Sequence, residues 1–128
     1  VGREEGSGTR GAFEELIKVN GEAVEGKCKY ANVYNSTGAA KQAVAGNENA
    51  IAYISLSAVD DTVKALQVDG VSPSEATVKD GTYKVQRPFL MITKKGTTNE
   101  LAKAFLEFVN SQEGQQIIAE NGAVPNNS

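Results

Sequence analysis

A short polar run near the start of the chain carries residue types that could bind an anion. Arg3 stands four residues before Ser7, within the turn Gly6-Ser7-Gly8-Thr9. The hydroxyls of Ser7 and Thr9 can donate hydrogen bonds, and the glycines let the backbone come close to a ligand. The guanidinium of Arg3 is a planar, permanently charged fork that matches two oxygens of a tetrahedral oxyanion. These residues predict a half-site for phosphate.

The elements around this run are expected to increase its positive potential. An apolar start precedes Arg3, and Phe13, Leu16 and Ile17 follow at the i, i+3, i+4 spacing of a helix. A strand that leads through a turn into a helix presents free N–H groups at the helix N-terminus, where the helix dipole adds partial positive charge. We expect this helix to run from residue 7 or 9 to 18, with Glu14 and Lys18 as an exposed i, i+4 pair.

The same turn also has a simpler interpretation. Ser7 or Thr9 could cap the helix and bind nothing, because both residue types are favoured at N-caps. Short Gly-rich motifs also recur by chance. Ser36 and Thr37 precede a second expected helix, residues 39–45, which ends at Gly46. They too could donate to an anion, but capping is the favoured interpretation there.

Composition narrows the possible functions. The chain has 128 residues, of which 40% are hydrophobic and 23% charged, as in a globular domain with a core of its own. A net charge of −3 argues against a nucleic-acid partner, which calls for a basic face. There is no histidine, and the single cysteine, Cys28, is expected to be a packed thiol. Common zinc sites and most acid–base triads are therefore excluded, and we expect neither an enzyme nor a cofactor.

Apolar segments alternate with helical patterns along the rest of the chain. Residues 50–55, 63–68 and 85–93 are predicted strands, and Phe89-Leu90-Met91-Ile92 is the strongest of them. Ser72 is the predicted cap of a short helix that reaches Lys79. A longer helix is expected from the caps at 97–100 onward, with an apolar face over 101–109 and a continuation to 120. No segment approaches the ~20 apolar residues that a membrane span requires. Alternating strands and helices indicate a layered α/β fold.

Residues 3–10 resemble the signature of the phosphate-specific substrate-binding proteins of bacterial ABC transporters, within the type 2 periplasmic-binding-protein group. Further blocks follow in the order of the family. Residues 46–55 are similar to an inner strand, residues 81–89 to the return crossing, residues 105–115 to the C-terminal helix pair, and residues 122–125 to the ending. The resemblance covers nearly the whole chain and implies a lobe of a type 2 periplasmic-binding-protein-like α/β fold.

The resemblance also implies a division of the chain. Residues 1–86 would be the central, second lobe, which carries the anion-binding turn. Residues 87–128 would be the crossing strand and helix pair that return to the first lobe in the family. The N-terminal lobe would then be missing, so the chain is expected to be a fragment. The apolar helix face at 101–109 would pack locally or in a dimer.

The function implied by the resemblance is capture of inorganic phosphate outside the cytoplasm, in the periplasm or on the cell surface as a lipoprotein. The phosphate would be delivered to permease subunits without any chemistry. The implied site consists of Arg3, Glu5, Ser7, Gly8 and Thr9.

Two neighbours of this set have roles that the resemblance leaves open. Glu5 stands where many members carry aspartate, and it could accept a hydrogen bond from phosphate or orient Arg3. Arg10 is expected on the helix surface. The alternative functions are binding of sulfate or molybdate, and a surface module without a ligand. A nucleotide enzyme is disfavoured because no lysine follows Gly6-Ser7-Gly8-Thr9.

Overall fold

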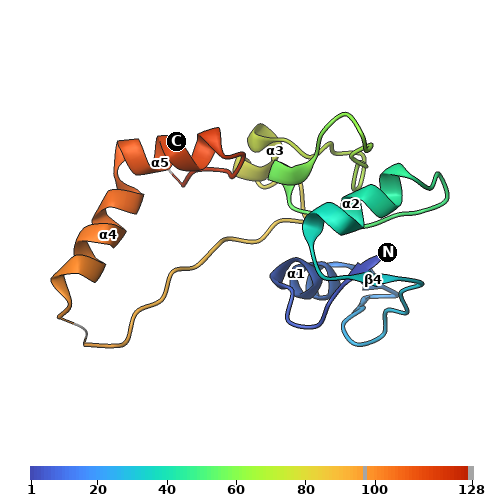
Figure 1. The fold of residues 1–128 in the computed structure, drawn as a ribbon, viewed down its shortest axis with the longest axis horizontal. Coiled ribbons are helices and arrows are strands. Elements are labelled where there is room, and N and C mark those ends of the chain that lie inside the picture. Colours follow the sequence, from blue (N-terminus) through green and yellow to red (C-terminus); the bar gives the residue numbers. More distant parts are fainter. Residues whose placement is uncertain (97, 127–128) are drawn as a thin grey trace. The chain divides into compact units, whose positions relative to one another are not determined.

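The computed structural model describes residues 1–96 and 98–126, and its internal contacts divide the chain into two units (Figure 1). The first unit is Val1–Arg87 and the second is Pro88–Ser128. The second unit contains helices α4 (Glu100–Asn110) and α5 (Gln112–Glu120). The elements of the first unit are β1 (Gly2–Arg3), α1 (Gly8–Leu16), β2 (Lys18–Val19), β3 (Glu22–Ala23), β4 (Val33–Tyr34), α2 (Thr37–Ala45), the 3-10 helix η1 (Leu56–Ala58) and α3 (Glu75–Lys79).

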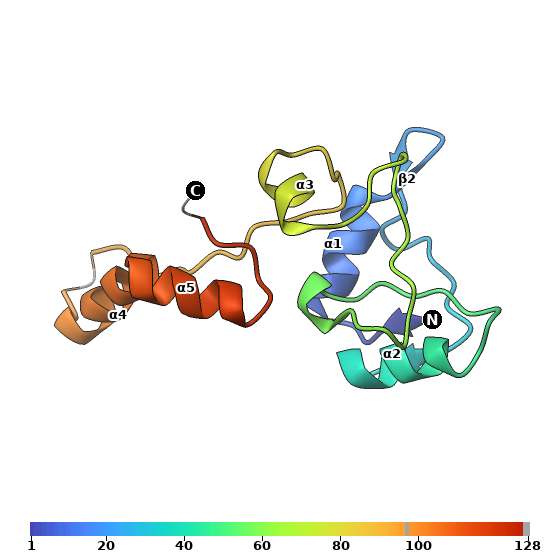
Figure 2. The same cartoon turned by 90° about the horizontal axis from the view of Figure 1, so that it is seen from above.

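The strands β1 and β4 form a parallel pair that sets the position of both long helices of the first unit. Gly2 lies opposite Val33, and Arg3 lies opposite Tyr34. Each strand leads into a helix, β1 into α1 and β4 into α2. Figure 2 shows β1 between these two helices. Because parallel strands end at the same edge of a sheet, both helices start near that edge.

Helix α1 is shorter than predicted because the chain turns into a hairpin. The helix ends at Leu16, and Ile17 is already extended. β2 then pairs antiparallel with β3 across a turn in which Asn20 has φ 54° and Gly21 has φ 83°. Two positive φ angles in a two-residue loop suit asparagine followed by glycine. The predicted exposed pair of Glu14 with Lys18 is wrong, since Glu14 is buried and Lys18 belongs to the hairpin.

The three predicted strands over 50–55, 63–68 and 85–93 are wrong in the described residues. Only an isolated bridge, Val68 with Val71, forms there, around a turn at Asp69 and Gly70. A strand needs a neighbour for its backbone hydrogen bonds, and in the described residues these stretches form no ladder, although the Val1 amine donates to Ile51 O. Several of their side chains are open to solvent, as Ile51 shows with 64% exposure.

The interior of the first unit is small and partly aromatic. Ala40 of α2 is the one buried apolar side chain among the described residues, which is less core than the composition indicated. Phe13 of α1 stacks on Tyr53 with ring centroids 4.4 Å apart, and Tyr53 meets Tyr30 edge to face at 6.0 Å. Gly2 lies directly against the Tyr30 ring. This cluster joins α1 and β1 to two connecting segments of the chain.

Capping side chains start α2, α3, α4 and α5, with one difference from the prediction. Ser74, not Ser72, caps α3, and it exchanges hydrogen bonds with Thr77 in a capping box. The predicted end of that helix at Lys79 is confirmed. Asn99 caps α4, whereas the predicted cap residue Thr97 lies outside the described residues.

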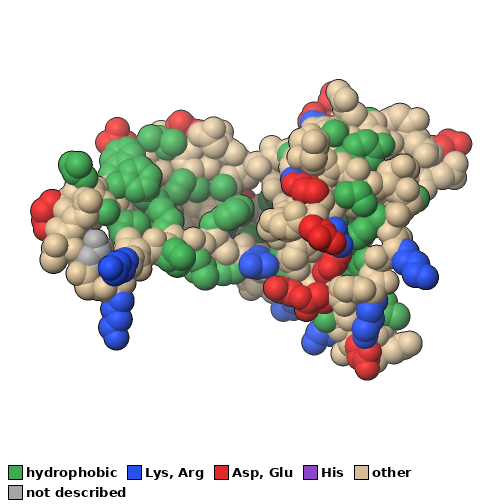
Figure 3. Space-filling model, turned by 60° about the horizontal axis from the view of Figure 1, so that its bottom comes forward, with side chains coloured by type: hydrophobic (Ala, Val, Ile, Leu, Met, Phe, Trp, Pro, Cys, Tyr) green, Lys and Arg blue, Asp and Glu red, His purple; other side chains and the backbone are tan. Residues whose placement is uncertain are grey.

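The second unit is a corner of two helices with an exposed apolar surface. Ser111 ends α4 and caps α5, and α4 packs against α5. The predicted apolar face of α4 exists, but Leu101 is 83% exposed. Ile117 of α5 is 45% exposed. Figure 3 shows hydrophobic side chains gathered over this unit. Within the described residues, no helix combines the length and the apolar character needed to cross a membrane.

Candidate anion-binding site

The N-terminus of α1 presents two backbone donors that the described part of the chain leaves without an acceptor. Ser7 is the N-cap, and its Oγ accepts from Arg10 N at 3.3 Å. Its carbonyl oxygen accepts from Gly11 N at 3.0 Å. The amides of Gly8 and Thr9 have no such partner. The capping interpretation is therefore confirmed for Ser7, yet the hydroxyl still has its own proton to donate, because a hydroxyl accepts and donates at once.

The guanidinium of Arg3 is held at the end of β1 by two neighbours. Its Nε and Nη2 donate to the two carboxylate oxygens of Glu4 at 2.8 and 2.9 Å. Its Nη1 donates to Thr37 Oγ1 at 2.9 Å, at the first residue of α2. Only 11% of the Arg3 side chain is exposed. A guanidinium has five N–H donors, so two are left for a further acceptor.

The pairing keeps both Arg3 and Glu4 ionised. The hydrogen bond to Glu4 raises the pKa of Arg3, and the same bond lowers the pKa of the Glu4 carboxyl. The carboxylate that orients Arg3 is therefore Glu4, not Glu5 as one interpretation of the sequence suggested. Glu5 is exposed and lies beside Gly6 and Ser7 at the rim of a hollow of about 300 Å³.

The other predicted residues lie at the turn itself. Gly6 has φ 85°, a conformation that favours glycine, and it leads the chain from Glu5 into the helix. A Cβ placed on Gly8 would have no atom within 4 Å, so the space beside its backbone is open. Thr9 Oγ1 has no hydrogen-bond partner among the described residues. The structure thus brings Ser7, Gly8 and Thr9 together at one helix end, with Arg3 on the strand before it.

Arg10 lies under the turn, so its predicted position on the helix surface is wrong. Its Nε donates to Glu14 Oε1 at 2.9 Å, and its Nη1 donates to Arg3 O at 3.2 Å. The guanidinium carbon lies 5.3 Å from the centroid of the Tyr30 ring. The Arg10 side chain is 21% exposed, and Glu14 is buried at 6%.

Glu14 is fully hydrogen bonded in this interior. Tyr30 OH donates to its Oε1 at 2.9 Å, and Gly26 N donates to its Oε2 at 3.3 Å. The hydrogen bonds from Arg10 and then Tyr30 lower the pKa of Glu14, so it stays ionised. Burial is the main cause that raises the pKa of the Tyr30 phenol, so that group stays protonated.

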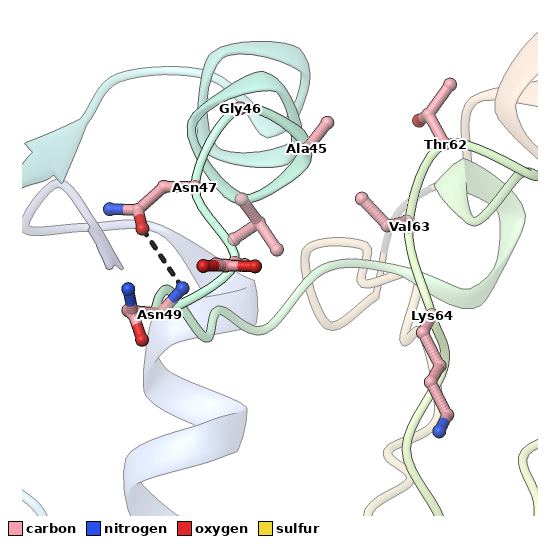
Figure 4. Close-up of a pocket in the computed structure, with 9 residues that line it drawn as sticks. Ala45, Gly46, Asn47, Asn49, Thr62, Val63 and Lys64 are labelled. Atoms are coloured by element: carbon pink, nitrogen blue, oxygen red, sulfur yellow. Dashed lines mark hydrogen bonds between the residues drawn. The ribbon is translucent and has the colours of Figure 1, made fainter.

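A second and larger hollow, of about 570 Å³, lies at the C-terminal end of α2 (Figure 4). Its lining comes from residues 44–49 and 62–64. Asn47 Oδ1 accepts from Asn49 N at 3.0 Å, and Lys64 points away from the helix. The C-terminal carbonyls of a helix carry partial negative charge, and Glu48 adds a full one. This hollow therefore disfavours an anion, although it is larger than the one at the turn.

Three residues of the site were missed in the sequence. Glu4 was passed over for Glu5, although the neighbour of an arginine is well placed to pair with it. Ser36 does cap α2, as predicted, but Thr37 contacts Arg3 instead of only starting a helix. Glu14 looked like a surface residue because its helix was expected to be longer. The sequence did contain a signal for Thr37. It has two segments in which a strand leads through Ser or Thr into a helix, and the two helix starts come together when the strands pair in parallel.

A sequence profile described as the PBP superfamily domain matches residues 1–113. The chain belongs to the PBP superfamily. The similar curated proteins in this group are called phosphate-binding protein PstS 2. The one from Streptococcus agalactiae serotype V is 40% identical over 98% of this chain and 44% of its own length. The one from Streptococcus pneumoniae is 43% identical over 94% of this chain and 43% of its own length. The chain thus spans less than half of the curated relatives that it matches.

Solved structures of the PBP superfamily are similar in both fold and sequence. One is a phosphate ABC transporter substrate-binding protein from Clostridium perfringens, solved with bound phosphate. It aligns with a TM-score of 0.80 and 41% identity. The alignment covers 98% of this chain and 51% of that one. A phosphate-binding protein from Streptococcus pneumoniae aligns with a TM-score of 0.78 and 43% identity, over 94% and 48% of the two chains. The predicted resemblance and the α/β fold class are confirmed.

Proposed function

We propose that the chain binds inorganic phosphate at the N-terminus of α1, as part of an extracytoplasmic protein that delivers phosphate to an ABC-transporter permease. The observation that carries this proposal is the pair of free amides at Gly8 and Thr9, next to the N-cap Ser7, with Arg3 oriented at the end of the strand that precedes the turn. The names of the similar proteins support the choice of phosphate. Binding and release require no catalytic group, so the proposed protein is not an enzyme and needs no cofactor.

The proposed contacts use donors for the phosphate oxygens and one acceptor for a phosphate proton. The amides of Gly8 and Thr9 and the hydroxyls of Ser7 and Thr9 donate, and Arg3 adds its two remaining N–H groups. Glu5, which lines a hollow together with Gly6 and Ser7, accepts from a protonated phosphate oxygen. Each bond to a charged group contributes about 1.5–3 kcal/mol when water is excluded. These residues would form one wall of the site, contacting the phosphate from one side only and leaving its other side in water. We therefore expect millimolar affinity, about −4 kcal/mol, for the chain alone.

We further propose that a second lobe closes over this wall. The basis is coverage, because the similar structures are about twice as long as the aligned part. Residues 1–86 would form the wall with the turn, and residues 87–128 would return to the other lobe. The exposed apolar face of α4 would then be covered by that lobe, or by a second copy when the chain is alone. Anchoring at the cell surface as a lipoprotein belongs to the same proposal.

The direct test is an NMR titration of the ¹⁵N-labelled chain with inorganic phosphate, with sulfate as the parallel titrant. The amide signals of Gly8 and Thr9 should shift and saturate with phosphate. Thr9→Val should weaken this response without lowering the melting temperature, because Thr9 Oγ1 forms no hydrogen bond with the described residues. Thr98→Val is the matched control, since that hydroxyl also has no hydrogen-bond partner among the described residues and lies in the other unit.

The outcomes separate the candidate functions. Saturating shifts at the turn that are selective for phosphate would support the proposal. Equal shifts with sulfate would replace it with a general oxyanion site. If no signal near the turn moved at phosphate concentrations far above the millimolar range, the turn would be a helix cap without a ligand.

A further inference from the structure

An ion pair lies beside the turn: the partly buried Arg10 and the buried Glu14 line the same hollow as Gly6 and Ser7. Arg10 and Glu14 are one helical turn apart in α1 and bond at 2.9 Å. Among the described residues, Glu14 receives three hydrogen bonds, from Arg10, Tyr30 and Gly26. Such a well-bonded carboxylate is an unusual occupant of the interior of a unit with so little apolar core.

Stability alone is a weak reason for this pair. Removing two charges from water costs free energy that their attraction often only offsets, and well-packed apolar residues in their place are frequently as stable. Apolar residues, however, cannot fix the relative orientation of the segments that they join. A hydrogen-bonded pair fixes the angle between the pieces of chain that it joins.

The pieces joined here are those that form the proposed site. Arg10 Nη1 donates to Arg3 O, so the first turns of α1 are tied to the end of β1 across the turn at residues 5–9. The backbone N–H of Arg10 also donates to Ser7 Oγ, which sets the position of that hydroxyl. Glu14 in turn holds the Arg10 side chain by a hydrogen bond. It also accepts from Tyr30 OH, so it links Arg10 to the loop over residues 24–30. A change at Glu14 therefore reaches Arg3 through the Arg10 side chain, and Ser7 through the backbone of the same residue.

We propose that Arg10 and Glu14 are positioning residues of the anion site: their pair ties α1 to the end of β1 and holds the Ser7 hydroxyl, the free amides and Arg3 in register for phosphate. The inference rests on the proposed function for its ligand. It assigns neither residue a contact with phosphate.

A purely electrostatic role predicts the opposite sign for one substitution. If these residues acted only through their charge, Glu14→Gln would tighten phosphate binding, because it removes a negative charge near an anion. Arg10→Lys would keep the affinity, because it keeps the positive charge. If the pair acts by positioning, Glu14→Gln weakens binding, and Arg10→Lys is as weak as Arg10→Met because an ammonium cannot bridge Glu14 and Arg3 O in the same geometry.

The experiment is the phosphate titration by NMR, applied to Glu14→Gln, Arg10→Lys, Arg10→Met and the unmodified chain. Glu15→Gln is the matched control, since it removes the same charge from the adjacent position. Glu15 is 55% exposed and pairs with Arg87 away from the turn. We expect Glu14→Gln and Arg10→Lys to bind phosphate about tenfold more weakly, as is typical when a supporting hydrogen bond behind a site is lost. Glu15→Gln should stay within a factor of two of the unmodified chain.

A second readout needs no ligand and so separates this inference from the proposed function. Backbone ¹⁵N relaxation of the phosphate-free chain should show lower order parameters at Gly6, Gly8 and Thr9 in Glu14→Gln than in Glu15→Gln. This comparison still decides the inference if the unmodified chain fails to bind phosphate. Should Glu14→Gln not fold, as judged by tyrosine fluorescence, Arg10→Lys takes its place in both measurements.

Two results would overturn the positioning role. One is tighter phosphate binding by Glu14→Gln together with unchanged binding by Arg10→Lys, which is the electrostatic outcome. The other is a turn whose order parameters are the same in all variants. Weaker binding with a looser turn in both Glu14→Gln and Arg10→Lys supports it.

Discussion

Replacement of Gly2 by alanine should destabilise the first unit, because the site-bearing strand has no room for a methyl group there. A Cβ on Gly2 would lie 2.5, 2.6 and 2.7 Å from three carbons of the Tyr30 ring. Carbon atoms in contact normally lie about 3.5–4.0 Å apart, so the overlap is on the order of 1 Å. The ring is not free to yield, since its hydroxyl is bonded to Glu14 and its edge meets Tyr53.

The expected cost follows from the behaviour of overpacked interiors. Inserting a methyl group into a filled space costs about 1–3 kcal/mol. For a cooperative unit of under a hundred residues, each kcal/mol lowers the melting temperature by about 4–8 °C. Gly2→Ala should therefore melt roughly 4–24 °C below the unmodified chain.

Tyrosine fluorescence is a suitable assay for this prediction. The chain has four tyrosines, at positions 30, 34, 53 and 83, and no tryptophan, so the signal comes only from the first unit. Gly38→Ala is the control, because a Cβ at Gly38 in α2 meets nothing within 4 Å. It should melt at or above the temperature of the unmodified chain, since alanine favours helix over glycine. Equal melting temperatures for Gly2→Ala and Gly38→Ala would refute the packing of Tyr30 described above.

Two other properties can be checked independently. Gly114→Ala should disrupt the corner between α4 and α5, because its Cβ would lie 2.2 Å from Phe108 O and 2.9 Å from Val109 backbone atoms. The far-UV circular dichroism spectrum should lose helix signal while tyrosine fluorescence stays unchanged. An unaltered spectrum would contradict the corner. Hydrogen bonds from Lys41 and then Thr62 lower the pKa of Asp60 to about 2, so its stabilising contribution is present above the unfolded pKa near 3.9 and is lost as the pH falls towards 2. A carboxyl ¹³C titration of Asp60 should give that low midpoint and move upward in Lys41→Met; a midpoint near 4 in both chains would disprove the pairing.

Local signals in the sequence were sufficient for the turn and its helices. Ser7 and Ser36 cap their helices as expected, and Gly46 ends α2, because these features depend on neighbours within a few residues. The pairing of Arg3 with Thr37 depends instead on the parallel register of two strands about thirty residues apart. No window of the sequence contains that register, so Thr37 could be predicted only as part of a cap.

The strand predictions failed for a related reason. Apolar, β-branched stretches such as residues 50–55 satisfy local preference, but a strand exists only where a second segment accepts its hydrogen bonds. The burial of Glu14 was equally non-local. It follows from Tyr30 and Gly26, which return to α1 after the hairpin, and a helical spacing cannot indicate what will cover a given face.

The extended segment Phe89–Ile92 has a consequence for the behaviour of the chain in concentrated solution. Phe89 and Ile92 are 92% and 91% exposed, and the backbone of the segment pairs with no strand. Short apolar stretches of this kind can stack with their own copies into intermolecular sheets. Pro88 before it and Lys94 and Lys95 after it act as gatekeepers, because proline cannot donate to such a sheet and like charges repel in register. The lysine part of this protection is electrostatic, so it weakens as added salt screens the charges, whereas the proline part persists.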